Sequence, residues 1–335
     1  MLGQNDMPKR FFEKLKNKTY KMKIKDNIQL FQSIILSTIL FVGVFFYGLD
    51  ISILEIWVVF IFVIGLDFVF QNFVKHVWSQ KIIFPFSWVN AAFGICFFLR
   101  SEDIWVYVLA AIIAILSKYL LTIRWKHFLN PSNAAVCMIL LIFPQFTWVN
   151  TLQWWNYTWE ITYLYIIAVL WVIWLWIFMM LQVRRIVHYS YLYDYILPFL
   201  LLHFALFFII PYYEPWSSFF LFFNVSFFIF TFFMMTDPKT VPHTSLWRIF
   251  FAASLVLTFY LLQFHINESY AILFSLFYNT ILLPVIWNLE EKPNYLVFLY
   301  VMYYSVIVGL IIYYINIYWA PDLVFDNICN QMICK

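Results

Sequence analysis

Long apolar runs follow one another along the chain with only short links between them, and this pattern restricts the fold more than any other feature. A helix that crosses a bilayer needs about 20 mostly apolar residues. Apolar residues make up 65% of the chain and charged residues 11%, so too few polar side chains remain to cover a surface in water. The sequence predicts an all-α, polytopic transmembrane helix bundle of about 10–11 spans. It excludes a soluble enzyme, a disordered chain and a nucleic-acid-binding domain. The expected spans are Ile28–Tyr47, Ile51–Val74, Ile82–Leu99, Ile104–Leu121, Pro131–Val149, Ile161–Leu181, Tyr195–Ile210, Ser217–Met235, Leu246–Phe264, Tyr270–Trp287 and Tyr295–Tyr318.

The distribution of basic residues predicts the orientation of this bundle. Lys and Arg accumulate in the cytoplasmic segments of membrane proteins. With the N-terminus inside and the spans alternating, 18 of the 20 Lys and Arg residues fall on the cytoplasmic side, and only Arg100 and Lys335 fall outside. We therefore expect a basic cytoplasmic segment (residues 1–27), one transmembrane domain (residues 28–318) and an extracytoplasmic C-terminal tail (residues 319–335).

The two ends of the chain indicate different contacts. The basic head favours binding to anionic lipid headgroups besides acting as an orientation signal, and a docking site for a cytoplasmic partner is the alternative. The tail contains Cys329 and Cys334, which could close a small disulfide loop in an oxidising compartment.

Few ionisable side chains fall inside the expected spans. Asp67 lies about two turns from the cytoplasmic end of the second span, and His203 lies deep in the seventh. Such a carboxylate marks either ion or proton traffic or a hydrogen-bonded anchor between helices, and both interpretations of Asp67 stay open. His203 has no second histidine on a facing span, which argues against a bis-histidine haem. The chain contains no CxxC or HExxH spacing, and no metal site is predicted.

Two polar loops interrupt the apolar pattern with similar chemistry. In the first, Asn130 precedes Pro131, and in the second, Asp237 precedes Pro238. Asn or Asp followed by Pro is typical of a helix start, so we expect both residues to cap helices. Four spans separate the loops, so both should open on the cytoplasmic face. A helix N-terminus with nearby cations suits an anionic or polar ligand. The candidate cofactor-binding residues are Lys118, Arg124, Lys126, His127, Asn130, Asn133, Thr236, Asp237, Lys239 and Thr240.

The residues of these loops resemble a known family. The pattern K-x-L-L-x-I-R-x-K-H-x-x-N-P-S-N over Lys118–Asn133 and the pattern F-F-M-M-T-D-P-K-T-x-P over Phe232–Pro242 are similar to the RnfD/NqrB superfamily. Its members are the D subunit of the Rnf electron-transport complex and the B subunit of the Na+-translocating NADH:quinone oxidoreductase. The K-H and N-P form, together with Arg184-Arg185, looks closest to the UnbU-like branch. Order and spacing agree over roughly Phe84–Ile286.

The resemblance implies two pseudo-symmetric halves related to the urea-transporter fold, a bacterial cytoplasmic (inner) membrane location and a flavin-linked role. Electron-transport members carry covalent FMN on a Thr in an S/T-G-A-T stretch, and this chain contains no such stretch. The resemblance therefore implies a noncovalent flavin (FMN or riboflavin) and other membrane or redox subunits as partners. Two alternatives stay open, namely a transporter for a small riboflavin-like molecule and a non-catalytic membrane scaffold of a larger complex.

Overall fold

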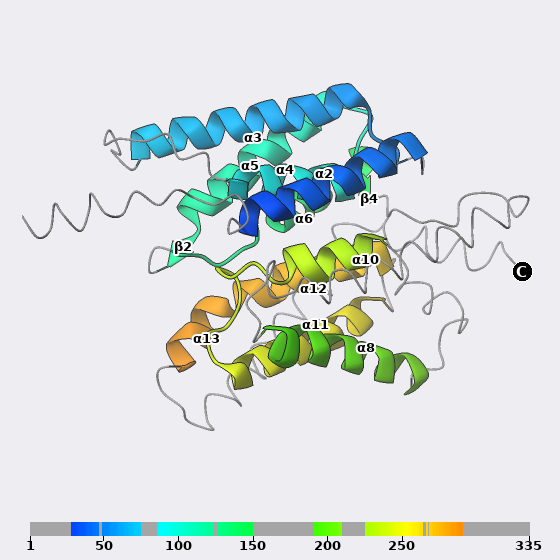
Figure 1. The fold of residues 1–335 in the computed structure, drawn as a ribbon, viewed down its shortest axis with the longest axis vertical. Helices are drawn as coiled ribbons and strands as arrows, with labels where there is room; N and C mark the ends of the chain where they lie inside the picture. The colour runs from blue at the N-terminus through cyan, green and yellow to red at the C-terminus, as the bar shows by residue number, and fades with distance from the viewer. Residues whose placement is uncertain are drawn as a thin grey trace, which may run out of the picture.

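The computed structural model describes residues 28–46, 49–74, 86–123, 126–149, 191–209, 225–263, 266 and 268–290 (Figure 1). The head (1–27), the expected spans Ile161–Leu181 and Tyr295–Tyr318, and the tail with Cys329 and Cys334 lie outside these residues.

The described elements are mostly helical. The first part of the chain contains α2 (Ile28–Phe46), α3 (Ile53–Val74), α4 (Phe86–Phe98), β1 (Leu99–Arg100), α5 (Ile104–Leu120), β2 (Thr122–Ile123), β3 (Lys126–His127), α6 (Pro131–Ile142), the 3-10 turn η2 (Pro144–Phe146) and β4 (Trp148–Val149). The second part contains the π-helical turn η3 (Leu192–Ile196), α8 (Leu197–Ile209), α10 (Val225–Ile229), the π-helical turn η4 (Phe230–Met234), α11 (Ser245–Gln263), α12 (Glu268–Ile281) and α13 (Leu283–Glu290).

These elements form two groups in space, which we call the N-terminal group (α2–β4) and the C-terminal group (η3–α13). Figure 1 shows the blue and cyan helices of the first group above the green, yellow and orange helices of the second. Helices α10 and α12 lie on the side of the C-terminal group that faces the N-terminal group (Figure 1). Helix α12 contacts α6, so the two groups pack directly on each other.

One helix in each group contains a long stretch that is buried on all sides. Every residue from Ala91 to Phe98 in α4 and from Ala271 to Thr280 in α12 is buried. Residues 91–98 of α4 are apolar all round, as suits the interior of a bundle, whereas α12 also buries polar side chains. Helix α4 packs against α2, α3, α5 and α6, whereas α12 packs against α11 and α6.

Helix α3 shows how an outer helix divides its surface. Its buried residues Val59, Val63 and Asp67 recur every four positions and form one stripe, whereas Trp57 and Ile61 are about 60% exposed. Large apolar side chains exposed in this way suit contact with lipid tails. Asp67 therefore lies on the inward face of the helix.

Several helices are shorter than the sequence predicted. The expected span Pro131–Val149 is helical only to Ile142, because Pro144 cannot continue the helix and the chain turns through η2 into β4. The expected span Tyr270–Trp287 consists of α12 and α13, which meet at a 46° bend, and Pro284 lies just after the break. Among the described residues, two helices are long and apolar enough to cross a bilayer, or three if the bent pair counts as one span.

The described part of the chain is mostly helical, and two small two-stranded sheets accompany the helices. Strand β1 pairs antiparallel with β4, with Leu99 opposite Val149, and β2 pairs antiparallel with β3, with Thr122 opposite His127. We call the paired strands β2 and β3 together the hairpin. The first sheet joins the C-terminal ends of α4 and α6, and the hairpin follows the C-terminal end of α5.

The buried guanidinium of Arg100 closes the C-terminal end of α4. It donates hydrogen bonds to the carbonyl oxygens of Cys96, Phe97 and Leu99 at 2.8, 3.3 and 2.5 Å. Carbonyl groups in the last turn of a helix have no partner within the helix, and a cation there also interacts favourably with the helix dipole. This local role explains why Arg100 occurs on the side of the bundle where the sequence places few Lys and Arg residues.

Candidate functional site

Asn130 caps α6, as the sequence predicted. Its backbone is extended, with φ −67° and ψ 120°, and its side-chain oxygen accepts hydrogen bonds from the Asn133 backbone N–H at 3.2 Å and from the Ser132 hydroxyl at 2.9 Å. Pro131 occupies the first helical position, where its missing N–H leaves no bond unmade. The first turn of α6 is thus fixed by its own local sequence.

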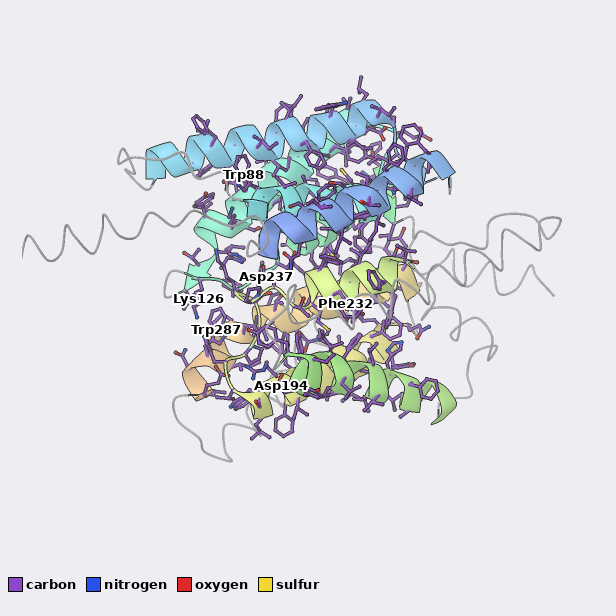
Figure 2. The ribbon with its side chains drawn as sticks, viewed as in Figure 1. Trp88, Lys126, Asp194, Phe232, Asp237 and Trp287 are labelled. Atoms are coloured by element: carbon purple, nitrogen blue, oxygen red, sulfur yellow. The ribbon has the colours of Figure 1, made fainter. Side chains whose placement is uncertain are left out.

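The same side chain connects the two polar loops. The Asn130 amide nitrogen donates a hydrogen bond to the carbonyl oxygen of Met234 at 3.0 Å, across 104 residues of sequence. Both residues are buried. The structure therefore brings together the N-P and T-D-P loops, and Figure 2 shows Lys126 and Asp237 on the same side of the molecule.

The prediction that Asp237 caps a helix was wrong. Helix α11 begins at Ser245, eight residues later, and the intervening segment is a series of turns. A side-chain oxygen of Asp237 accepts a hydrogen bond from the Lys239 N–H at 3.1 Å, and its carbonyl oxygen accepts one from the Thr240 N–H at 2.9 Å. Asp followed by Pro suits a tight turn as well as a helix start, because the short carboxylate can bond the backbone two residues on. We call residues 236–244 the turn segment.

Glu290 of α13 occupies the N-terminal end of α11. Its carboxylate accepts hydrogen bonds from the backbone N–H groups of His243 and Thr244 at 2.7 and 2.9 Å, and it contacts the His243 Nδ1 at 2.7 Å. Backbone N–H groups at the start of a helix need acceptors from outside the helix. A carboxylate that is distant in sequence thus takes the place predicted for Asp237, and no local sequence pattern points to it.

The hairpin reaches the turn segment through a second polar contact. The Lys126 ammonium lies 2.8 Å from the His243 Nε2. Lys126, Lys239 and the imidazole of His243 are exposed, whereas Asp237 is half-buried. This part of the surface therefore offers exposed cations beside a carboxylate.

His127 lies on the buried side of the hairpin. Its Nδ1 is 3.0 Å from the carbonyl oxygen of Leu129. Burial lowers the pKa of His127 below its ordinary value of 6.5, and the neighbouring Asp237 carboxylate opposes this effect, whereas Lys239 adds to it. His127 therefore favours the neutral form, in which the imidazole carries one donor and one acceptor.

Arg248 holds the end of the turn segment in place. Its guanidinium donates hydrogen bonds to the carbonyl oxygens of Pro242, at 3.3 Å, and of His243, and it pairs with the Asp194 carboxylate at 2.5 Å. Asp194 lies in η3 and also accepts a hydrogen bond from Ser245 at 2.8 Å. The sequence signal for this pairing was an arginine at the third position of an expected span, because a charge inside a span needs a partner.

The remaining candidate residues are held within the bundle. Lys118 pairs with the Asp67 carboxylate at 2.8 Å, and Tyr119 donates to the same oxygen at 2.8 Å, so these groups join α5 to α3. The Asn133 amide donates to the Leu273 carbonyl oxygen of α12 at 3.0 Å. Arg124 lies outside the described residues.

The two buried threonines of the second motif bond to nearby backbone. Thr236 donates to the carbonyl oxygen of Phe232 at 2.6 Å, and the Thr240 hydroxyl donates to the carbonyl oxygen of Asp237 at 3.3 Å. The structure thus brings Thr236, Asp237, Lys239 and Thr240 into one turn. Within that turn, Lys239 and Asp237 keep the more accessible side chains.

His203 lies in an aromatic cluster away from these loops. Its ring lies 4.9 to 5.8 Å from the rings of Phe199, Phe227, Phe259 and Tyr260. In the described part of the chain, no three His, Cys, Asp or Glu side chains form a group that could hold a metal ion.

The contact between the two loops is the feature that could bind a ligand. It presents ammonium and imidazole groups on a framework of buried hydrogen bonds, which suits an anionic or polar group. Comparison of the whole chain with protein-family models gives no match, and none of the curated protein sequences matches it significantly.

Proposed function

We propose that the chain is a polytopic subunit of about 10–11 spans, in two halves, that holds a noncovalent flavin in a membrane redox system. The flavin would lie where the hairpin meets the turn segment. The observation that supports this proposal is the hydrogen bond from Asn130 to Met234, which joins the two motifs on which the family resemblance rests. With the N-terminus in the cytoplasm, this junction faces the cytoplasm, where other redox subunits would dock.

The residues at the junction fit a phosphate better than an uncharged ring system. Asn130, Thr236 and Thr240 are buried and already hydrogen-bonded inside the protein. Lys126 and Lys239 are exposed, and ammonium groups bind phosphate as point charges. FMN therefore fits the site better than riboflavin does. A bound flavin would supply the electron chemistry, and the residues of this chain would hold and orient it.

The test is the spectrum of the purified protein. We expect a yellow preparation that releases its flavin in acid, and Lys239→Gln should retain severalfold less FMN. Asp103→Asn at the opposite end of α5 is the control and should retain as much as the wild type. A colourless preparation that also fails to bind added FMN would overturn the proposal.

One feature of the interior favours transport of a small polar solute as a second candidate function. Ser275, Asn279 and Thr280 of α12 are buried, and α12 meets the first turn of α6 through the bond from Asn133 to Leu273. Helices that end or bend in mid-membrane and meet at a polar seam are typical of transporters. Uptake of labelled riboflavin by vesicles containing the protein tests this function, and the redox proposal predicts no uptake.

A further inference from the structure

Three side chains form a continuous polar chain between the two helix groups. Lys126 of the hairpin contacts the His243 Nε2 at 2.8 Å, and the opposite nitrogen of the ring, Nδ1, lies 2.7 Å from the Glu290 carboxylate. Lys126 belongs to the N-terminal group, whereas His243 and Glu290 belong to the C-terminal group. The His243 ring is therefore the connecting piece, and we call its contact with Lys126 the hairpin latch.

The latch requires one protonation state of His243. The ammonium of Lys126 has donors only, so Nε2 must accept its hydrogen bond. In that state the proton of the neutral ring lies on Nδ1 and is donated to Glu290. A protonated imidazole has donors on both nitrogens, so Nε2–H and the ammonium would face each other as two donors and two positive charges.

The side chain of His243 is accessible to protons from solution. It is 52% exposed, whereas the side chain of Glu290 is 6% exposed. On protonation, the bond to Glu290 gains charge and is kept, whereas Lys126 is repelled into solvent. The latch is therefore the contact that opens, and the deeper bond from Asn130 to Met234 has no titratable group and stays.

We propose that the hairpin latch is a pH-dependent connection that opens when His243 is protonated and frees the hairpin from the turn segment. This inference concerns the connection between the helix groups and does not depend on which ligand binds at the junction.

Other charged groups lie near the His243 ring but are not part of the latch. Arg248 of α11 donates to the backbone carbonyl of His243, and Asp237 and Lys239 lie on the same turn segment. The Trp287 ring of α13 lies 5.9 Å from the imidazole and carries no charge. The titratable neighbour His127 lies beside Lys126 in the hairpin, so the test must separate its protonation from that of His243.

The test measures the distance between the hairpin and α11 in the full-length protein in lipid nanodiscs. Spin labels are placed at the exposed positions Thr122→Cys and Leu246→Cys, with Cys329 and Cys334 replaced by Ser. We expect one short, narrow distance at pH 8. At pH 5.5 a longer, broader distance should appear, and the ratio of the short to the long population should fall about tenfold, which corresponds to about 1.4 kcal/mol.

Two variants make the result decisive. His243→Gln can donate to Glu290 and accept from Lys126 but does not titrate, so it should keep the short distance at both pH values. Lys126→Met removes the donor and should show the long distance at both. The inference is wrong if the wild type shows no change with pH, if His243→Gln changes as the wild type does, or if Lys126→Met keeps the short distance.

Discussion

Asn130 performs two tasks with the two ends of one amide group. Its oxygen caps α6 and its nitrogen holds the Met234 carbonyl. Asn130→Asp keeps the cap but places a carboxylate against the Met234 carbonyl oxygen. We therefore expect the free energy of unfolding to fall by roughly 1–3 kcal/mol at neutral pH. The loss should shrink in acid, where the protonated carboxyl can donate.

Thermal unfolding followed with a thiol-reactive dye measures this effect in a protein with Cys329 and Cys334 replaced by Ser, because Cys96 and Cys137 are buried and free. Thr38→Val on the exposed face of α2 is the control and should unfold like the wild type. An Asn130→Asp protein as stable as the wild type at neutral pH would show that the bond to Met234 contributes nothing.

His127 makes stability depend on pH. Because burial lowers its pKa from 6.5 in the folded protein, the unfolded chain binds a proton that the folded protein does not. Stability should therefore fall as the pH drops below about 6.5, and His127→Gln should reduce the slope. Melting temperatures between pH 7.5 and 5.5, measured in a His243→Gln background, check this, and identical slopes would contradict it.

At the scale of single residues, the sequence correctly predicted those side-chain roles that depend only on adjacent residues in the chain. The cap at Asn130 follows from the adjacent Pro131, and it is confirmed. Asp237 could form either a helix cap or a tight turn. It forms the turn, and the carboxylate of Glu290, 53 residues later in the sequence, binds the N–H groups at the start of α11 instead. The binding of a ligand by these residues stays a prediction.

At the scale of the helices, the close contact between α4 and α6 depends on the absence of a side chain at Gly94. A Cβ atom at Gly94 would lie 2.4 Å from the Ser132 hydroxyl oxygen, so Gly94→Ala must push the first turn of α6 away. We expect Gly94→Ala to lower the free energy of unfolding by roughly 1–3 kcal/mol. The measurement is the same dye-based melting experiment.

Gly65 of α3 provides the matched control. Nothing lies within 4 Å of a Cβ atom there, so Gly65→Ala should stabilise the helix by roughly 0.5–1 kcal/mol. Equal effects of the two substitutions would mean that α4 and α6 are not in close contact at Gly94.

Element boundaries were predicted less well than element positions. Apolar runs locate the helices, because hydropathy is a property of the local sequence. The run from Pro131 to Val149 reads as one span, yet the pairing of β4 with β1 and the turn at Pro144 end the helix at Ile142. Strand pairing joins distant parts of the chain, so the hydropathy pattern cannot reveal it.

At the scale of the whole molecule, α5 separates two surfaces that should face opposite sides of the membrane. Its 17 residues span roughly 25 Å from Ile104 to Leu120. We expect a membrane-impermeant maleimide to label Glu102→Cys only from outside the cell and Thr122→Cys only in inside-out vesicles. Cys329 and Cys334 are replaced by Ser in both variants. Labelling of both positions from one side would contradict the proposed orientation.

The burial of α4 from Ala91 to Phe98 has a consequence for biosynthesis. Its 13 residues cover roughly 20 Å, less than the thickness of the hydrocarbon core, and α5 and α6 emerge from the ribosome after it. A short segment of this kind gains its final surroundings only when later helices arrive, so the insertion machinery must retain it meanwhile. Truncated nascent chains that stop before α6 should therefore remain bound to the translocon and be degraded when released.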